Sequence, residues 1–292
     1  MIDELKNFAD QLKNAITGFV STSPENYCEL YQGPYFDAPL IGFARGDDPI
    51  FDEVKEQVGP LSWTPREALE GSLPPGKLQK KIKLEDISVV SWVLPIHSLV
   101  RATNRREKTQ PSPEWSYTRN YGEEFNNSLK KFVTDWLEAR GCPAVAPSLL
   151  PGFKIIKDPV RRNFTSTWSE RHIAYACGLG TFSLNDGLIT ARGIAHRLGS
   201  VVVNTKLPRA ERPYSGHMDY CLASRGCTAC IRRCPVNALN SGGHDKELCN
   251  IMNYSGEEAA RRRERLGFEQ TGCGLCQVGV PCEDRIPARK SP

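Results

Sequence analysis

The 292-residue sequence predicts an α+β fold followed by a short cysteine-rich segment. Two observations predict the first part. Apolar residues recur at helical spacing near residues 2–19 and 125–137, and β-branched runs at 87–96 and 199–204 are typical of strands. The third observation is that eight of the 11 cysteines follow residue 220. At roughly 150 residues per domain, the length also predicts two domains. We place them at residues 1–207 and 208–292.

The first elements can be justified in chain order. Apolar residues three or four apart predict a first helix with one buried face; they are Ile2, Leu5, Phe8, Leu12, Ile16 and Phe19. Seven prolines in residues 33–80, Pro74 and Pro75 included, predict loops with short helical turns. The run 87–96 predicts a buried strand, and residues 122–140 predict a long helix that Gly141 ends.

The second half of the first domain also contains predicted strands and a predicted helix. Residues 153–156 predict a strand, and residues 169–177 a helix with Ser169 at its start and Gly178 at its end. Two further strands are predicted at 188–190 and 199–204. Pro208 and Pro213 then indicate a linker to the cysteine-rich segment.

Charge and hydropathy exclude several classes of protein. The 38 basic and 34 acidic residues leave a formal charge of +4, too small to indicate nucleic acid binding, so we expect no nucleic acid partner. Apolar runs such as Val201–Val203 are far shorter than the ~18 residues that a membrane span needs. Asp3 and Glu4 stand where an export signal has basic residues. We therefore expect a cytoplasmic protein without membrane spans.

The cysteines are spaced as ligands. Cys227, Cys230 and Cys234 read C-x2-C-x3-C-P, and Cys221 stands six residues before Cys227. Bacterial two-cluster ferredoxins use C-x2-C-x2-C-x3-C-P, in which the cysteine before proline ligates the other cluster. In a reducing cytosol, such crowding favours thiolates on metal over disulfides.

Eight cysteines match two clusters of four ligands, with each group lending one ligand to the other. We assign the first cluster to Cys221, Cys227, Cys230 and Cys282, and the second to Cys234, Cys249, Cys273 and Cys276. Soft thiolates suit iron–sulfur units, so the sequence predicts two 4Fe-4S clusters. Two structural zinc sites are the alternative. The Cys-Pro-Val-Asn-Ala-Leu run from Cys234 is ferredoxin-like and disfavours zinc.

The residues before the cysteines resemble a known family. The stretches 168–185, 187–190 and 196–204, in this order, are similar to the corrinoid-domain core of epoxyqueuosine reductases and reductive dehalogenases. In that superfamily a tandem 4Fe-4S module follows this core. The resemblance covers about residues 85–292. It implies a nitroreductase-like domain that binds cobalamin in the base-off form, followed by a ferredoxin-like domain.

The resemblance also implies cofactor contacts. Residues 178–180 match the family's Gly-Leu-Gly turn, and residues 199–200 match its strand entry. Glycine lets the backbone approach a flat macrocycle, and small polar side chains can bond its amide arms. The simpler alternative is that Gly178 only ends a helix and Gly199 only opens a strand. The expected contacts are Gly178, Leu179, Gly180, Ser183, Asn185, Gly199 and Ser200.

The segment Arg119-Asn120-Tyr121 resembles the stretch around the proton-donating acid of epoxyqueuosine reductases, which reads Arg-Asp-Tyr. Here Asn120 replaces that acid, and an amide cannot act as a general acid. Tyr121 or Tyr117 can take the role that a tyrosine has in reductive dehalogenases, with Arg119 or Arg171 lowering its pKa. The alternative is that both tyrosines only pack.

Two further departures concern the ends of the chain. Epoxyqueuosine reductases usually continue into a helical-repeat domain that helps hold tRNA, whereas this sequence ends at Pro292. Respiratory dehalogenases usually begin with a twin-arginine signal, which is not found here. The sequence therefore resembles a short cytosolic relative of both.

Together these features predict an oxidoreductase, a cobalamin-dependent iron–sulfur reductase. Electrons from a soluble ferredoxin or flavodoxin would pass through the second cluster and then the first to cobalt, which reduces a small-molecule substrate. One alternative is an electron-transfer or corrinoid-reactivating protein, which has no substrate of its own and acts on a partner corrinoid protein. Another is a flavin-binding iron–sulfur oxidoreductase.

Overall fold

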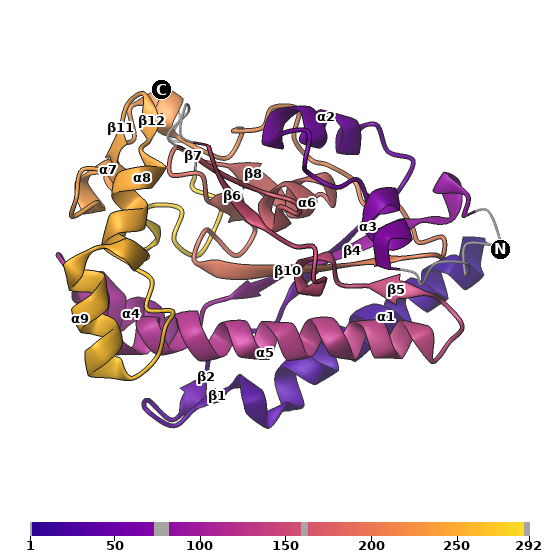
Figure 1. Cartoon of the computed structure of the whole chain (residues 1–292), viewed down its shortest axis with the longest axis horizontal. Coiled ribbons are helices and arrows are strands. Elements are labelled where there is room, and N and C mark those ends of the chain that lie inside the picture. The colour runs from indigo at the N-terminus through magenta and orange to yellow at the C-terminus, as the bar shows by residue number, and fades with distance from the viewer. Residues whose placement is uncertain (1, 73–81, 159–162, 289–292) are drawn as a thin grey trace.

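The computed structural model describes residues 2–72, 82–158 and 163–288, and it confirms a mixed fold of helices and strands (Figure 1). Within these ranges no helix is long and apolar enough to cross a membrane. The helices are α1 (Ile2–Thr22), α2 (Ile50–Val58), α3 (Pro65–Ser72), α4 (Ser98–Arg106), α5 (Pro113–Glu138), α6 (Glu170–Ala176), α7 (Ala229–Arg233), α8 (Lys246–Asn250) and α9 (Glu257–Leu266).

Short strands pair off around one longer sheet. The strands are β1 (Tyr27–Cys28), β2 (Gly33–Pro34), β3 (Leu40–Arg45), β4 (Ser88–Pro95), β5 (Ala144–Val145), β6 (Ile155–Asp158), β7 (Asn163–Ser166), β8 (Gly180–Phe182), β9 (Leu188–Thr190), β10 (His196–Val203), β11 (Leu239–Asn240) and β12 (Gly243–His244). The sheet has the order β3-β4-β10-β5, and every neighbouring pair in it is antiparallel. β5 pairs only with Val202 and Val203. Among the described residues, the rest of that edge of β10 has no strand partner.

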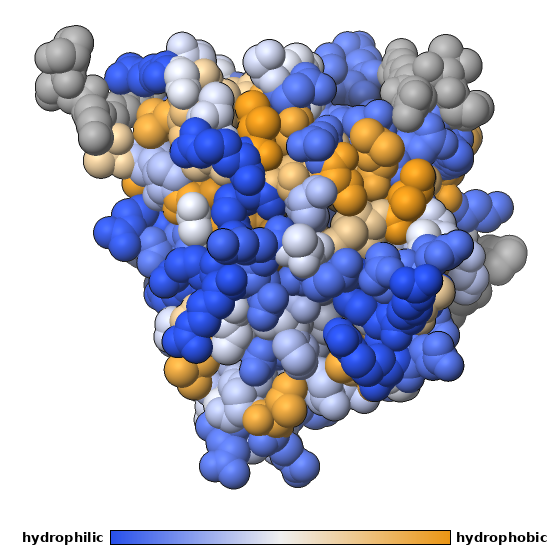
Figure 2. Space-filling model, turned by 90° about the vertical axis from the view of Figure 1, so that its left-hand side faces the viewer, coloured by the Kyte–Doolittle hydropathy of each residue, from blue (hydrophilic) through white to orange (hydrophobic). Residues whose placement is uncertain are grey.

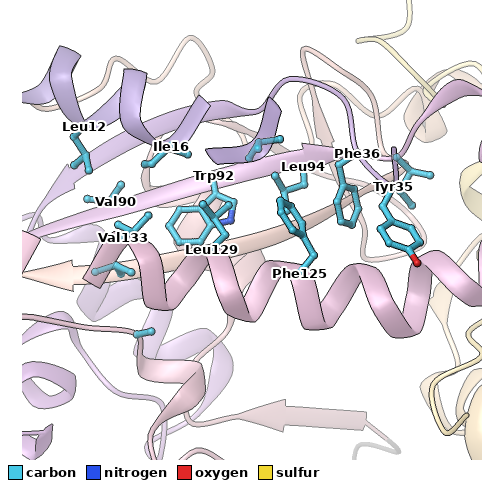
Figure 3. Packing of buried hydrophobic residues seen from close by; sticks show 14 of the residues in the cluster. Leu12, Ile16, Tyr35, Phe36, Val90, Trp92, Leu94, Phe125, Leu129 and Val133 are labelled. Carbon is cyan, nitrogen blue, oxygen red and sulfur yellow. The ribbon is translucent and has the colours of Figure 1, made fainter. Parts of the chain in front are cut away.

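Helices cover both faces of this sheet, as Figure 1 shows. On one face α1 and α5 pack against Trp92 and Val90 of β4, with Leu12, Ile16 and Leu129 among the contacts (Figure 3). On the other face α2, α3 and α6 pack against strand residues that include Val89. Because successive strand side chains point to opposite faces, Val89 and Val90 enter different layers. The whole of β4 is therefore buried, as its sequence predicts.

A polar link fixes α5 over β10. The indole Nε1 of Trp92 donates to Asn126 Oδ1 at 3.0 Å, and Asn126 Nδ2 donates to the carbonyl of Leu198 at 3.0 Å. Asn126 is fully buried, so each of these bonds satisfies a group that has no access to water. This link holds α5 in place where it approaches the open edge of β10.

Two elements differ from the predictions. The long helix begins at Pro113 and not near 122, because Ser112 accepts a hydrogen bond from Trp115 N and caps the first turn. The proline-rich segment contains the edge strand β3, which starts after Pro39 and pairs within the sheet only with β4. Residues 73–81, with Pro74 and Pro75, lie outside the described residues.

The predicted linker after residue 207 is docked onto the first part of the chain. Arg209 and Arg212 pair with the buried Asp48 at 2.7 and 2.5 Å. Further along, Arg101 of α4 pairs with the buried Glu283 at 3.3 Å. The C-terminal segment, coloured orange to yellow, therefore lies against α4 and the start of α5 (Figure 1).

Candidate metal and cofactor site

The first predicted set of thiols surrounds one pocket. Cys221, Cys227, Cys230 and Cys282 all line it, and its cavity volume is about 30 Å³. Much of the remaining wall is apolar, including Ile189 of β9. Burial, together with the three other thiols of the set, raises the pKa of Cys282 to about 12. The four thiols are therefore close neighbours, although Cys282 is distant from the others in sequence.

The second predicted set is also brought together. Burial and then the neighbouring Cys273 and Cys234 raise the pKa of the Cys249 thiol to about 12. Burial raises the pKa of Cys276 well above its ordinary value, and Cys273 and Cys249 raise it further. These four side chains come from three separate stretches of chain.

Local structure presents the second set. Asp245 caps α8 by accepting hydrogen bonds from two backbone amides at 3.0 Å, and α8 carries Cys249. Gly274 lies between Cys273 and Cys276 at φ +64°, a conformation that favours glycine. A Cβ there would lie 1.9 Å from the ring of Trp115, so only glycine lets this turn pack on α5.

Amide groups donate hydrogen bonds to two thiols of the second set. Ala238 N donates to Cys234 Sγ and Asn253 Nδ2 to Cys249 Sγ, both at 3.2 Å. Such bonds are typical of iron–sulfur sites. In the part of the chain that the structure describes, no three His, Cys, Asp or Glu side chains are placed to hold one metal ion.

A group of charged side chains lies between α5 and the open edge of β10. Glu123 of α5 pairs with Arg197 of β10, with Lys130 at 3.5 Å and with Arg119 at 3.8 Å. Burial alone would raise the pKa of Glu123, but the three cations lower it to about 2. Two donors of this group, Arg119 Nη1 and Arg197 Nε, are buried without a hydrogen-bond partner.

Buried acceptors lie nearby. Ser200 Oγ donates to Glu170 Oε2 at 2.6 Å, while Glu170 Oε1 makes no hydrogen bond of ordinary geometry and has the Ser148 hydroxyl as its neighbour. Lys130 and Glu123 act on the pKa of Glu170, which places this carboxylate beside the charged group, and its burial raises that pKa. His196 Nε2 bonds the Leu188 carbonyl at 2.7 Å and leaves Nδ1 buried and unpartnered. Unpartnered buried polar atoms are rare in proteins and mark places where a ligand can bind.

The predicted catalytic residues lie on two sides of α5. Asn120 donates to Glu124 Oε1 at 3.0 Å and accepts from Gln270 N at 3.3 Å, so it joins α5 to the C-terminal segment. Tyr117 and Tyr121 pack edge-on against Phe268, with ring centroids 5.1 and 5.4 Å away. At 3.6 residues per turn, Arg119 projects from the opposite side of the helix. Arg119 therefore faces away from these two tyrosines, and a catalytic role for either of them stays a prediction.

The partner of Arg119 is a residue that sequence reasoning missed. Arg119 Nη2 donates to the hydroxyl of Tyr254 at 3.2 Å. Tyr254 lies in the π-helical turn Ile251–Ser255, which continues α8 after Cys249. Such turns are rare and often occur at functional sites. Nothing in the local sequence distinguishes this tyrosine, because its contact depends on how α8 packs against α5.

The predicted cofactor glycines have packing roles within the chain. Gly178 adopts φ +78° and ends α6, with its N–H bonded to the Tyr175 carbonyl at 3.1 Å. A Cβ at Gly180 would lie 2.2 Å from the Ile189 carbonyl, and one at Gly199 would lie 2.6 Å from the Trp92 indole. These contacts require glycine with or without a cofactor. Contact with a corrin ring stays a prediction.

The other predicted contacts also have partners. Ser183 Oγ donates to Asn185 Oδ1 at 2.6 Å, and Asn185 Nδ2 donates to the Cys276 carbonyl at 3.0 Å. Leu179 packs in the core beneath the second face of the sheet. Ser200 is fully buried and accepts from the Trp168 indole at 2.9 Å. Asn185 therefore connects the predicted cofactor region directly to the second thiol set.

Similarity to known sequences is confined to part of the chain. No family model matches it. The epoxyqueuosine reductase of Bacillus cereus is 31% identical over 121 residues, which are 40% of this chain and 30% of that protein. The epoxyqueuosine reductase of Bacillus anthracis is 30% identical over 121 residues, again 30% of its length. The chain thus matches less than a third of these curated relatives.

Solved structures are similar over most of the chain. A selenomethionine-labelled epoxyqueuosine reductase has a TM-score of 0.50 and 17% identity, covering 97% of this chain and 70% of that one. An epoxyqueuosine reductase with an epoxyqueuosine-modified tRNA stem loop has a TM-score of 0.50 and 18% identity, and the match covers 99% of this chain and 68% of that one. A catabolic reductive dehalogenase with 3-bromo-4-hydroxybenzoic acid has a TM-score of 0.51 and 14% identity, and the match covers 85% of this chain and 30% of that one.

The tRNA stem loop in the second of these structures leaves our expectation of no nucleic acid partner unsupported. The sequence matches and the structural matches agree on one group of proteins. This chain is therefore similar in part of its sequence to epoxyqueuosine reductases, and it has the fold of the epoxyqueuosine reductase and reductive dehalogenase structures above.

Proposed function

We propose that the chain is a corrinoid-dependent iron–sulfur reductase, an oxidoreductase that acts on a small substrate. The observation that carries this proposal is the gathering of eight cysteines into two sets of four beside a buried group of unpartnered polar atoms. The relatives named epoxyqueuosine reductase support a reductase activity. Residues 1–207 would form the nitroreductase-like corrinoid domain, and residues 208–292 the ferredoxin-like domain.

The unpartnered polar atoms fit a corrinoid. A corrin ring is edged with carboxamide arms, which need both donors and acceptors. Arg119 Nη1 and Arg197 Nε are buried donors without a hydrogen bond, and Glu170 Oε1 is a buried acceptor whose neighbour is the Ser148 hydroxyl. His196 adds a second acceptor, since burial lowers its pKa to about 4 and keeps the ring neutral near pH 7. When bound, base-off cobalamin would supply a strongly reducing, nucleophilic metal centre.

The contacts of Arg119 support the opposite order of the clusters to the one expected from the sequence. A Cβ on Gly272, next to Cys273, would lie 3.0 Å from Arg119 Cγ. Tyr254, which bonds Arg119, follows Cys249 by five residues. Both contacts link the charged group to the second thiol set. We therefore assign the second set, and not the first, to the substrate side, and the first set to the side of the ferredoxin or flavodoxin donor.

Tyr254 is the best placed proton donor. Its hydroxyl accepts a hydrogen bond from the Arg119 guanidinium at 3.2 Å, which holds the phenol beside the charged group. Tyr254 is 37% exposed, so it can recover a proton from solvent. The amide of Asn120 has no acidic proton, and its nitrogen and its oxygen are both hydrogen-bonded within the protein.

One observation favours a second function. The loss of the acid at position 120 also suits a protein that transfers electrons to a partner corrinoid protein and has no substrate of its own. The end of the molecule that carries α7, α8 and α9 is mostly hydrophilic, with separate apolar patches (Figure 2). Exposed apolar residues on or next to α8 include Leu248, Ile251 and Tyr254.

Metal and cofactor analysis tests the proposal. Protein reconstituted without oxygen with iron, sulfide and hydroxocobalamin should hold about eight Fe and about one Co. Dithionite should then produce the absorption spectrum of reduced cobalamin. Cys230→Ser and Cys276→Ser should each lose about four Fe, whereas Cys28→Ser, a buried thiol outside both sets, should lose none. If the protein held eight Fe but no cobalt, only the iron–sulfur part of the proposal would stand. If it held a flavin, the corrinoid part would be wrong and a flavin-binding oxidoreductase would take its place.

A further inference from the structure

A buried arginine lies beside the second thiol set without an acidic partner. The Arg262 guanidinium is in a side chain only 3% exposed. It donates to the Met252 carbonyl at 2.7 Å, to Thr271 Oγ1 at 3.3 Å and to the side-chain oxygen of Gln110. All three acceptors are neutral. Met252 follows Cys249, and Thr271 precedes Cys273, so the guanidinium bonds the two stretches that carry these ligands.

A second arginine repeats this arrangement. Arg233 Nε donates to the carbonyls of Leu275 and Val278, both at 3.1 Å, which lie on either side of Cys276. Its other nitrogens donate to the carbonyls of Glu107 at 2.8 Å and Asn104 at 3.2 Å. A cation that is buried, like Arg262, or half-buried, like Arg233, and bonds only neutral oxygens is costly unless negative charge lies close by. Burial lowers the pKa of Arg262, and Cys273 of the second thiol set and then Glu258 raise it, so the second set supplies negative charge beside this arginine.

Other thiols dominate the surroundings of the first set. Apart from burial and backbone bonds, the largest influences on the pKa of Cys230 and Cys282 among the described residues are the other thiols of the same set. By contrast, Arg262 and Arg233 both lower the pKa of Cys273, which burial raises. The buried charge that follows Cys282 is a carboxylate, Glu283, and Arg101 and Arg105 already pair with it. The two sets therefore differ in their electrostatic surroundings.

We propose that Arg233 and Arg262 give the cluster held by Cys234, Cys249, Cys273 and Cys276 the higher reduction potential of the two. Reduction adds one electron to a cluster, and a buried cation in a low dielectric stabilises that added negative charge. The first electron from a donor therefore rests on the cluster nearer the charged group of Arg119 and Glu123. This proposal rests on the proposed function only in requiring that both sets hold clusters.

Assignment of the two potentials tests the order. Anaerobic wild-type protein, reconstituted with both clusters, is titrated with dithionite while electron paramagnetic resonance follows each reduced cluster. The signal with the higher midpoint should disappear in Cys276→Ser and persist in Cys230→Ser. The opposite result would overturn the proposal. Wild-type protein that takes up no iron would instead overturn the proposed function.

Substitution of Arg262 tests whether its positive charge raises the reduction potential of the second cluster. Arg262→Gln should lower the midpoint of the higher-potential signal alone, and Arg262→Lys, which keeps the charge, should restore most of it. Arg261→Gln is the matched control, because Arg261 is 67% exposed on the same helix and pairs with Glu257 and Glu258. If Arg262→Gln fails to take up iron at the second set, Arg233→Gln serves in its place. Unchanged midpoints in an iron-replete neutral variant would refute the assignment.

Discussion

At the scale of single residues, the site depends on contacts between side chains far apart in sequence. Tyr254 and Arg119 are 135 positions apart, yet their polar atoms lie within hydrogen-bond distance. Tyr117 and Tyr121 match the family pattern more closely in sequence, but they pack against Phe268 on the other side of α5. Substitution of each of the three tyrosines therefore tests whether the structure or the sequence motif identifies the proton donor.

Tyr254→Phe should lower substrate turnover about 100-fold or more, because it removes the proposed proton donor and leaves the ring in place. Iron content and the reduction of bound cobalamin by dithionite should not change. Tyr117→Phe and Tyr121→Phe are matched controls and should retain turnover, measured over a range of pH. If Tyr254→Phe kept full turnover and Tyr121→Phe lost it, the proton donor would be Tyr121, the residue that the sequence motif indicates.

At the scale of elements, short turns hold the ligands against the long helix α5. The turn that contains Cys273 and Cys276 packs on the ring of Trp115 through Gly274. Asn104 of α4 adds a bond from Nδ2 to the Cys273 carbonyl at 3.2 Å. The second cluster site therefore depends on α4 and α5 as well as on its own cysteines.

Gly274→Ala should displace this turn, because its Cβ would overlap the Trp115 ring and its φ of +64° disfavours a side chain. Iron analysis should show the loss of about four Fe, with the other four retained. Gly267→Ala is the matched control, since Gly267 has φ +77° with no atom within 4 Å of a Cβ. Equal iron contents in the two variants would mean that contact with Trp115 does not position the ligands.

At the scale of the whole molecule, α5 is held to the sheet by both packing and charge. Glu123 of α5 keeps a pKa of about 2, against an ordinary value near 4.5, because Arg197, Lys130 and Arg119 stabilise its charge. A group whose pKa is lower in the folded state stabilises the fold above its ordinary pKa. That contribution declines as the pH falls through about 4.5 towards 2.

Glu123→Gln should therefore lower the thermal midpoint near pH 7, where the difference in pKa corresponds to about 3 kcal/mol. The gap between variant and wild type should stay constant down to about pH 5 and narrow below it. Calorimetry at several pH values measures this difference in thermal midpoint, and Glu258→Gln, which changes an exposed carboxylate on α9, is the control. A difference that does not depend on pH would show that the Glu123 carboxylate is not ionised in the folded protein.

The sequence by itself determined the elements whose pattern is local. Periodic apolar residues predicted α1, and β-branched runs predicted β4, β9 and β10. The ferredoxin-like pattern of the cysteines predicted two sets of four in which each group lends one ligand to the other, and binding of a cluster by each set stays a prediction. The start of α5 and the edge strand β3 were missed, since a cap and a sheet edge leave weak local signals.

Only the tertiary structure decided which side chains meet. It paired Glu123 with Arg197, Arg119 with Tyr254, and the arginines Arg233 and Arg262 with the second thiol set. It also assigned Asn120 to a structural contact and the motif tyrosines to an aromatic cluster. The physical reason is that electrostatic and hydrogen-bond partners are set by distance in space. Burial makes these pairings energetically important, and it arises only when the sheet, its helices and the C-terminal segment pack together.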